Sequence, residues 1–357
     1  MPNRQIEIDG IRGWAALSVL FCHLFVDTFG DIFPGFRNMF THLFFNGALA
    51  VAIFFVLSGD ALSLSYLKSR SGRSLDSIVV KRYFRLTVPI LMSCSLVYCL
   101  MAIGLIFNVQ AADVVHREAW LGTPLHFAPS FWGMLHYSLS QVYEGHTLGV
   151  SYNPFLWTMA VEMIGSMVVL LYLHIAGRLK YPELTLKVLI VFLFIVRSYN
   201  YYFLCGLLLG KWRANGTLAQ IQNSKKWRFG KLLIFTISIL IIANTKGMAM
   251  STWLAPPMLV FVFYTTNVTI KFFTSRLSRF LGKISFSLYL VHFAVLSSLT
   301  SFLIVRYQSE NGLDLSNIAV ILCISAVVCI VVAVIFEKIE AAAMKIVNRI
   351  PAKLFTT

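Results

Sequence analysis

Long apolar stretches recur along the whole chain, and they constrain its fold more than any other feature. An α-helix needs about 20 mostly apolar residues to cross a bilayer. Ten candidate segments cover residues 11–29, 45–66, 86–107, 154–176, 184–197, 198–213, 230–245, 251–267, 280–305 and 315–339. The fifth and sixth are short and almost contiguous, as in a tight hairpin or a broken helix pair. The sequence therefore predicts an all-α, polytopic membrane protein with about ten transmembrane helices.

The composition excludes the soluble classes of protein. Of the 357 residues, 58% are hydrophobic and only 13% are charged, which is about half the charged fraction of a typical soluble domain. The six cysteines form no CxxC pair and lie inside apolar runs, a pattern that fits neither a disulfide framework nor a zinc site. We expect residues 1–357 to form a single transmembrane domain that requires no metal.

The strong positive charge is explained by membrane topology. A net charge of +15 on a soluble chain would suggest a nucleic-acid partner. With a cytoplasmic N-terminus, however, 25 of the 30 Lys and Arg residues fall on the cytoplasmic side, as the positive-inside rule requires. The five on the outer side are Arg37, Arg117, Arg197, Lys246 and Arg306. We therefore predict cytoplasmic N- and C-termini and no nucleic-acid partner.

Ionisable residues inside the apolar segments are the first candidates for a functional site, because a charge within a membrane is costly. From the rise of an α-helix, His23 lies about 16 Å beyond Arg12 and on the same helix face. Glu162 and His292 lie about 12–14 Å from the ends of their own helices. These depths place His23, Glu162 and His292 near the midplane, where they can form an acid–base site. The alternative is that each only bridges helices through a hydrogen bond.

A second group of polar residues lies toward the cytoplasmic side. Arg82 and Arg85 are three positions apart at the predicted start of a helix, so they share a face. Two guanidinium groups at the cytoplasmic mouth suit phosphate groups, although ordinary positive-inside anchoring also explains them. Asp60 can pair with Arg12 or Arg85, or can make a structural bond between helices.

Five sequence motifs follow one another between Ile8 and His292. They are Ile8-Asp9-Gly10-Ile11-Arg12-Gly13-Trp14 with His23 eleven positions after Arg12, Phe54-Phe55-Val56-Leu57-Ser58-Gly59, Arg82-Tyr83-Phe84-Arg85, Leu156-Trp157-Thr158-Met159-Ala160-Val161-Glu162, and Leu281-Gly282-Lys283-Ile284-Ser285-Phe286-Ser287-Leu288-Tyr289-Leu290-Val291-His292. This set resembles the acyltransferase family 3 membrane proteins, which O-acylate carbohydrates and related acceptors. The chain departs from the family pattern at Asp60, Thr158 and Met163, and these departures bear on the substrate more than on the reaction.

The resemblance implies a membrane O-acyltransferase that uses cytosolic acyl-CoA, most often acetyl-CoA, to acylate a hydroxyl of a cell-surface or lipid-linked glycan. It marks the Arg12–His23 pair and the Arg82–Arg85 pair as essential positions. In the resulting hypothesis, Arg82 and Arg85 hold the CoA phosphates, and Arg12 binds the donor or polarises its thioester carbonyl. His23 is the general base or a transient acyl carrier, with Glu162 orienting or stabilising it.

Further expectations complete the hypothesis. Asp9, Asp60, Ser285 and His292 are secondary candidates for the site. The expected partners are acyl-CoA, a glycan or glycolipid acceptor and membrane lipid, in the cytoplasmic (inner) membrane of a bacterium, and the oligomeric state is not indicated. The chain is too short for the fused extracytoplasmic domain that some family members carry. The rival function is a proton-coupled transporter, which has no particular need of the cytoplasmic arginine cluster, and a third is an acyl-CoA-binding sensor without turnover.

Overall fold

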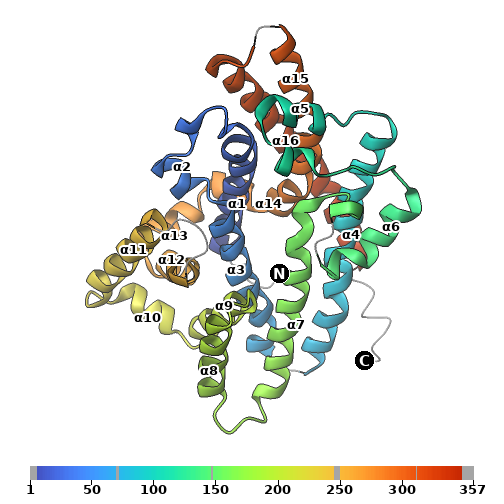
Figure 1. Cartoon of the computed structure of the whole chain (residues 1–357). Helices are drawn as coiled ribbons and strands as arrows, with labels where there is room; N and C mark the ends of the chain where they lie inside the picture. The colour runs from blue at the N-terminus through green and yellow to red at the C-terminus, as the bar shows by residue number, and fades with distance from the viewer. Residues whose placement is uncertain (1–5, 70–71, 146–147, 245–249, 311, 348–357) are drawn as a thin grey trace. The chain divides into compact units, whose positions relative to one another are not determined.

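The computed structural model describes residues 6–69, 72–145, 148–244, 250–310 and 312–347. Helices make up the regular secondary structure of these residues, and no strand occurs among them (Figure 1). The all-α prediction is therefore confirmed. The α-helices are α1 (Ile6–Phe21), α2 (Met39–Phe44), α3 (Gly47–Ser69), α4 (Gly72–Ala102), α5 (Asn108–Val115), α6 (Phe131–Leu139), α7 (Thr158–Ala176), α8 (Pro182–Ile195), α9 (Asn200–Ala214), α10 (Thr217–Asn223), α11 (Trp227–Asn244), α12 (Ala255–Thr265), α13 (Asn267–Phe273), α14 (Arg276–Val295), α15 (Ser301–Glu310) and α16 (Leu315–Val347).

Short segments of other helical types connect these helices. Three are π-helical, namely η1 (Cys22–Asp27), η3 (Glu118–Gly122) and η8 (Leu296–Thr300). Five are 3₁₀-helical, namely η2 (Pro34–Phe36), η4 (Gln141–Tyr143), η5 (Leu148–Val150), η6 (Pro154–Trp157) and η7 (Met250–Trp253). π-helical turns are rare and occur frequently at functional sites. The residues around the three π-helical segments are therefore candidates for a functional site.

Seven stretches of helix among the described residues are long and apolar enough to cross a membrane. They are Ile6–Asp27, Met39–Leu64, Lys81–Ala102, Pro154–Ala176, Trp227–Asn244, Arg276–Glu310 and Leu315–Val347. The other three predicted segments form α8, α9 and α12, which have 14, 15 and 11 residues and are shorter than a perpendicular span requires. Each predicted segment is thus helical, but a count of ten full spans is not confirmed. The cytoplasmic location of both termini stays a prediction.

The chain groups into two compact units. Unit 1 contains Met1–Ala15, Asn46–Arg82 and Val161–Lys283, and unit 2 contains Ala16–Phe45, Tyr83–Ala160 and Ile284–Thr357. Four of the five boundaries fall within helices, namely α1, α4, α7 and α14, so these helices contribute residues to both units. Whether residues 1–357 behave as a single domain, as the sequence predicts, stays a prediction.

In unit 1, α3 and α9 pack with their backbones in direct contact. A Cβ atom on Gly59 would lie 2.0 Å from the carbonyl oxygen of Phe203, and one on Gly206 would lie 1.9 Å from that of Val56. Small residues are typical of such close helix pairs in membranes. The glycine in the motif Phe54–Gly59 is therefore required by packing, and the close approach aligns Asp60 with α9.

A second backbone contact in unit 1 fixes α1. A Cβ atom on Gly13 would lie 2.4 Å from the backbone nitrogen of Gly282, in the first half of α14. Beside it, Nε1 of Trp14 donates a hydrogen bond of 2.9 Å to Oγ of Ser278. These contacts hold Arg12, the neighbour of Gly13, at a defined height and rotation within unit 1.

In unit 2, the first π-helical segment continues α1 and carries His23. Oγ1 of Thr28 donates to the carbonyl oxygen of His23 at 2.6 Å, so a side chain satisfies a backbone acceptor that the wider turn displaces. Leu24 on the same turn is fully buried. The turn is thus held by packing on one side and by hydrogen bonding on the other.

Candidate active site

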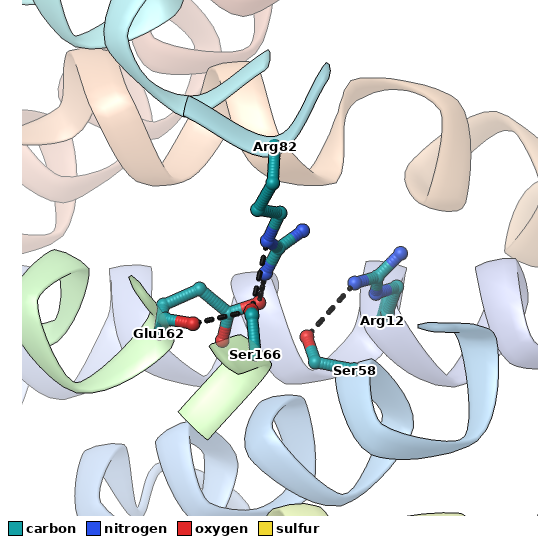
Figure 2. Close-up of polar contacts among 5 residues, drawn as sticks. All are labelled: Arg12, Ser58, Arg82, Glu162 and Ser166. Carbon is teal, nitrogen blue, oxygen red and sulfur yellow. Dashed lines mark hydrogen bonds and ion pairs between the residues drawn. The ribbon is translucent and has the colours of Figure 1, made fainter. Parts of the chain in front are cut away.

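The most buried arginine–carboxylate pair among the predicted site residues joins α4 to α7 in unit 1. Arg82 forms an ion pair through Nη2 with Oε1 of Glu162, and each side chain is only 10% exposed (Figure 2). Nε of Arg82 also donates to Oγ of Ser166 at 2.8 Å. Glu162 and Ser166 are four residues apart on one helix and therefore share a face. Together they fix the position of one guanidinium group.

Arg12 lies in the same polar region of unit 1. Its Nη2 atom donates to Oγ of Ser58 on α3 at 3.3 Å (Figure 2). The charges of Glu162, Asp9 and Arg82 all act on it electrostatically. A guanidinium has five N–H donors, and the recorded hydrogen bond occupies one of them with a neutral hydroxyl. Unit 1 therefore brings Arg12, Arg82, Glu162 and Asp9 into one cluster, which we call the arginine cluster.

Asp60 has a partner that the sequence did not predict. Its Oδ2 atom accepts a hydrogen bond of 2.9 Å from Nη2 of Arg213 on α9, and Nη1 of Arg213 lies 2.7 Å from Glu7. The Asp60 side chain has no exposed surface, and the guanidinium of Arg213 lies 4.2 Å from the ring centre of Tyr264. The pairings proposed for Asp60 with Arg12 and Arg85 are not what the structure shows. The third alternative, a structural bond between helices, agrees with this geometry.

Arg85 differs from Arg82 in its surroundings. The helix α4 begins at Gly72, so both arginines lie well inside it rather than at its start, where the sequence analysis placed them. Arg85 belongs to unit 2 and is exposed, and it acts electrostatically on Glu340 of α16. Ser285, a secondary candidate, is buried on α14 in unit 2.

A histidine–carboxylate pair forms on the π-helical segment of unit 2. Nδ1 of His23 lies 2.9 Å from Oδ2 of Asp27. An ionised carboxylate can only accept a hydrogen bond, so Nδ1 carries the proton and Nε2 carries the lone pair. Glu162 was the predicted orienting residue, but its carboxylate is bound to Arg82. Asp27 was overlooked, although its position four residues after His23 could have identified it.

Aromatic rings surround His23 in unit 2. The ring of Phe155 lies 4.2 Å from the ring of His23, centre to centre, at 9°, and the ring of His292 lies 5.5 Å away at 7°. Phe155 also stacks on His292 at 4.9 Å, and Trp120 lies 5.8 Å from His23. The structure thus brings together the two histidines that the sequence singled out, in what we call the imidazole cluster.

Ionic contacts connect the imidazole cluster to a segment outside the spans. Asp31 is bridged to Arg117 at 2.6 Å and to Arg37 at 2.5 Å. These hydrogen bonds, with that of Arg117 the larger effect, lower the pKa of the Asp31 carboxyl below its ordinary value. The guanidinium of Arg117 in turn lies 5.6 Å from the ring centre of Trp120. Asp31 and Arg117 therefore support the ring that packs against His23.

One group of side chains among the described residues has the spacing of a metal site. The ligand atoms of Cys22, His23 and Asp27 lie within 4.8 Å of one another. However, Oδ2 of Asp27 accepts from Nδ1 of His23 and from Sγ of Cys22 at 3.5 Å, so hydrogen bonds account for their proximity. The sequence predicted no metal, and that expectation stays a prediction.

Comparisons with known proteins agree with the motifs. The family model described as an acyltransferase domain matches residues 5–337. The O-acetyltransferase PaAT-1 of Phomopsis amygdali is 26% identical over 383 aligned residues, which cover 86% of this chain and 75% of that protein. No solved structure gives a significant match. Since the family match covers nearly the whole chain and several helices are long and apolar enough to cross a membrane, the protein belongs to acyltransferase family 3 and is an integral membrane protein.

Proposed function

We propose that this protein is a membrane O-acyltransferase that transfers an acyl group, with acetyl as the first choice, from acyl-CoA to a hydroxyl of a glycan or glycolipid. Family membership and the O-acetyltransferase relative support the type of reaction. The observation that carries the proposal is the His23–Asp27 pair. A histidine whose Nδ1 is held by a carboxylate presents Nε2 as a base or nucleophile, which is what transfer to a hydroxyl requires.

The arginine cluster is proposed to bind the anionic donor. Arg82 is already oriented by Glu162 and Ser166, so it loses little conformational freedom when it binds a phosphate. The hydrogen bond of Arg12 to Ser58 is to a neutral group, so an anionic ligand can compete for this guanidinium. Arg85, for which the sequence suggested the same role, is exposed and belongs to unit 2, and its contact with a phosphate stays a prediction.

The chemistry proposed for His23 needs only a proton transfer and an acyl transfer. In the direct form, Nε2 accepts the proton of the acceptor hydroxyl while the oxygen bonds to the thioester carbonyl carbon. The carbon–sulfur bond then breaks, and the departing thiolate takes the proton from the imidazolium. Asp27 stabilises that imidazolium, as the aspartate does in a catalytic triad. In the covalent form, Nε2 itself receives the acyl group first.

The cellular setting is a separate part of the proposal. We keep the cytoplasmic membrane of a bacterium, a cytosolic donor and a cell-envelope polysaccharide acceptor as predictions. The fungal origin of the relative makes a eukaryotic membrane the alternative. Heterologous expression and membrane fractionation, followed by assay of right-side-out and inside-out vesicles with acetyl-CoA, would determine which face accepts the donor.

The first experiment measures thiol release from acetyl-CoA by the purified protein in nanodiscs, with a crude glycan or lipid extract as acceptor. We expect release that depends on the extract and is lost in His23→Ala. The matched control is His136→Ala, which removes an exposed histidine on α6. Undiminished release by His23→Ala would refute its role. Folded wild-type protein that neither releases thiol nor binds CoA by calorimetry would refute the enzyme and favour the transporter.

A further inference from the structure

A second imidazole of the same cluster has an unsatisfied acceptor atom. His292 is 1% exposed, and its Nδ1 lies 2.7 Å from the carbonyl oxygen of Tyr289. A carbonyl can only accept, so Nδ1 carries the proton and Nε2 carries the lone pair. Among the described residues, Nε2 of His292 is a buried atom without a hydrogen-bond partner. Because leaving a buried acceptor unpaired is costly, we expect a hydrogen-bond donor from a bound ligand to pair with this atom.

The two imidazoles are arranged alike but are not equivalent. Their nearly parallel rings lie 5.5 Å apart, centre to centre, and each has its Nδ1–H fixed by an acceptor of its own. The acceptor is a carboxylate for His23 and a neutral carbonyl for His292. A carboxylate stabilises a positive imidazole, whereas a carbonyl only orients one. The environment of His23 therefore suits a cationic intermediate, whereas His292 is held neutral and becomes cationic only for the time that it carries a proton.

We infer that the two histidines act in succession, with His23 as the acyl carrier and His292 as the general base for the acceptor hydroxyl. This inference rests on the proposed function and chooses between its two forms. Direct transfer needs one base, so a second oriented imidazole, whose ring centre lies 5.5 Å from that of His23, is left without a role. A double displacement needs both, because the acylated nitrogen of the carrier can no longer accept a proton.

Each half of the reaction balances with these groups and with proton exchange to solvent. In the first half, Nε2 of His23 bonds to the thioester carbonyl carbon, the carbon–sulfur bond breaks, and CoA leaves as a thiolate. The negative charge of Asp27 balances the positive charge of the resulting acyl-imidazolium. In the second half, the acceptor oxygen bonds to the acyl carbon while its proton moves to Nε2 of His292. The carbon–nitrogen bond then breaks and restores His23, and the proton on His292 passes to solvent, which also supplies the proton of CoA thiol.

The test separates the two halves and needs no identified acceptor for the first. Radiolabelled CoA is incubated with unlabelled acetyl-CoA and protein, without extract, and label entering acetyl-CoA is measured. This exchange requires the acyl carrier but no base for a hydroxyl. We expect wild type and His292→Gln to exchange label, and His23→Gln to lose exchange. Acetyl transfer to the crude extract is expected to fall by about 10²–10⁴-fold in His292→Gln, the range typical of a lost general base.

Controls make each outcome decisive. His136→Gln should retain both activities, and thermal unfolding in detergent identifies any variant that fails to fold.

If His292→Gln does not fold, wild-type protein mixed with acetyl-CoA alone should release one equivalent of thiol in a burst and hold hydroxylamine-sensitive acetyl. If wild-type protein acetylates the extract but shows neither exchange nor a burst, the inference is overturned and the proposed function is left intact. Loss of exchange in folded His292→Gln, in proportion to its loss of transfer, also overturns it. A wild type without any transfer refutes the proposed function itself.

Discussion

Replacing Asp27 by asparagine tests the local chemistry of the site most directly. The substitution preserves the shape of the side chain but removes the negative charge that faces Nδ1 of His23 at 2.9 Å. The hydrogen bond from Thr28 to the His23 carbonyl does not involve Asp27, so the π-helical turn should persist. The imidazole then loses the stabilisation of its cationic form while the fold stays unchanged.

The expected size of the effect follows from the kind of hydrogen bond lost. A hydrogen bond to a charged group contributes about 1.5–3 kcal/mol, and each 1.36 kcal/mol is about tenfold in rate. The fall in kcat is therefore about 10–150-fold. The Asp27 side chain is 29% exposed, so solvent screening favours the lower part of that range. The KM for acetyl-CoA should change little, because the donor is proposed to bind at the arginine cluster.

The assay is thiol release under steady-state conditions with extract in excess. Asp113→Asn on α5 provides a matched control, since it makes the same chemical change at an exposed site. Asp27→Glu restores the charge and should recover part of kcat. If Asp27→Asn retains wild-type kcat, or if it raises KM with kcat unchanged, then Asp27 does not orient His23 for catalysis.

Three further predictions concern ionic contacts. Glu162→Gln leaves Arg82 charged and buried, so we expect a loss of about 3–5 kcal/mol in stability and a raised KM for acetyl-CoA; unchanged thermal unfolding and KM would contradict this. Asp60→Asn removes one of the two carboxylates that pair with Arg213 and leaves Glu7 as the other, so it should destabilise the protein by less than Glu162→Gln does, while kcat per folded molecule stays at the wild-type value; a selective loss of kcat would instead show a catalytic role. Because the pKa of Asp31 is lowered, its contribution to stability is present at neutral pH and is lost as the pH falls through the lowered value. The difference in melting temperature between wild type and Asp31→Asn should therefore disappear in acid, and a difference that persists there would refute the assignment.

The sequence predicted the fold class because membrane solubility imposes it locally. Every apolar segment has to be helical to satisfy its own backbone, and each of the ten predicted segments is helical in the structure. Whether α8, α9 and α12 also span depends on packing and tilt, which hydropathy does not contain. Length and hydropathy alone therefore do not determine the number of full spans.

The site was partly predictable for a similar reason. His23 and His292 stand out as ionisable residues in apolar surroundings, and the structure places them together. Their tautomers were not foreseeable, since these depend on Asp27 and on a carbonyl oxygen. Arg213 was also missed, because a basic residue near a helix end satisfies the positive-inside pattern whether or not it has a buried partner. Its pairing with Asp60 exists only through the close contact of α3 with α9.

The pairing of Asp60 with Arg213 also constrains how the chain can be made. Asp60 is synthesised 153 residues before its partner, which at about 5–20 residues per second amounts to roughly 8–30 s of translation. Over that time α3 carries a carboxyl group without this partner. Insertion of such a group at a helix centre costs about 2.5–3.5 kcal/mol, which is an upper limit for Asp60, four residues before the end of the span Met39–Leu64. Unit 1 cannot close before α9 has emerged from the ribosome. The final packing of α3 against its neighbours therefore has to wait for the synthesis of α9, which brings Arg213.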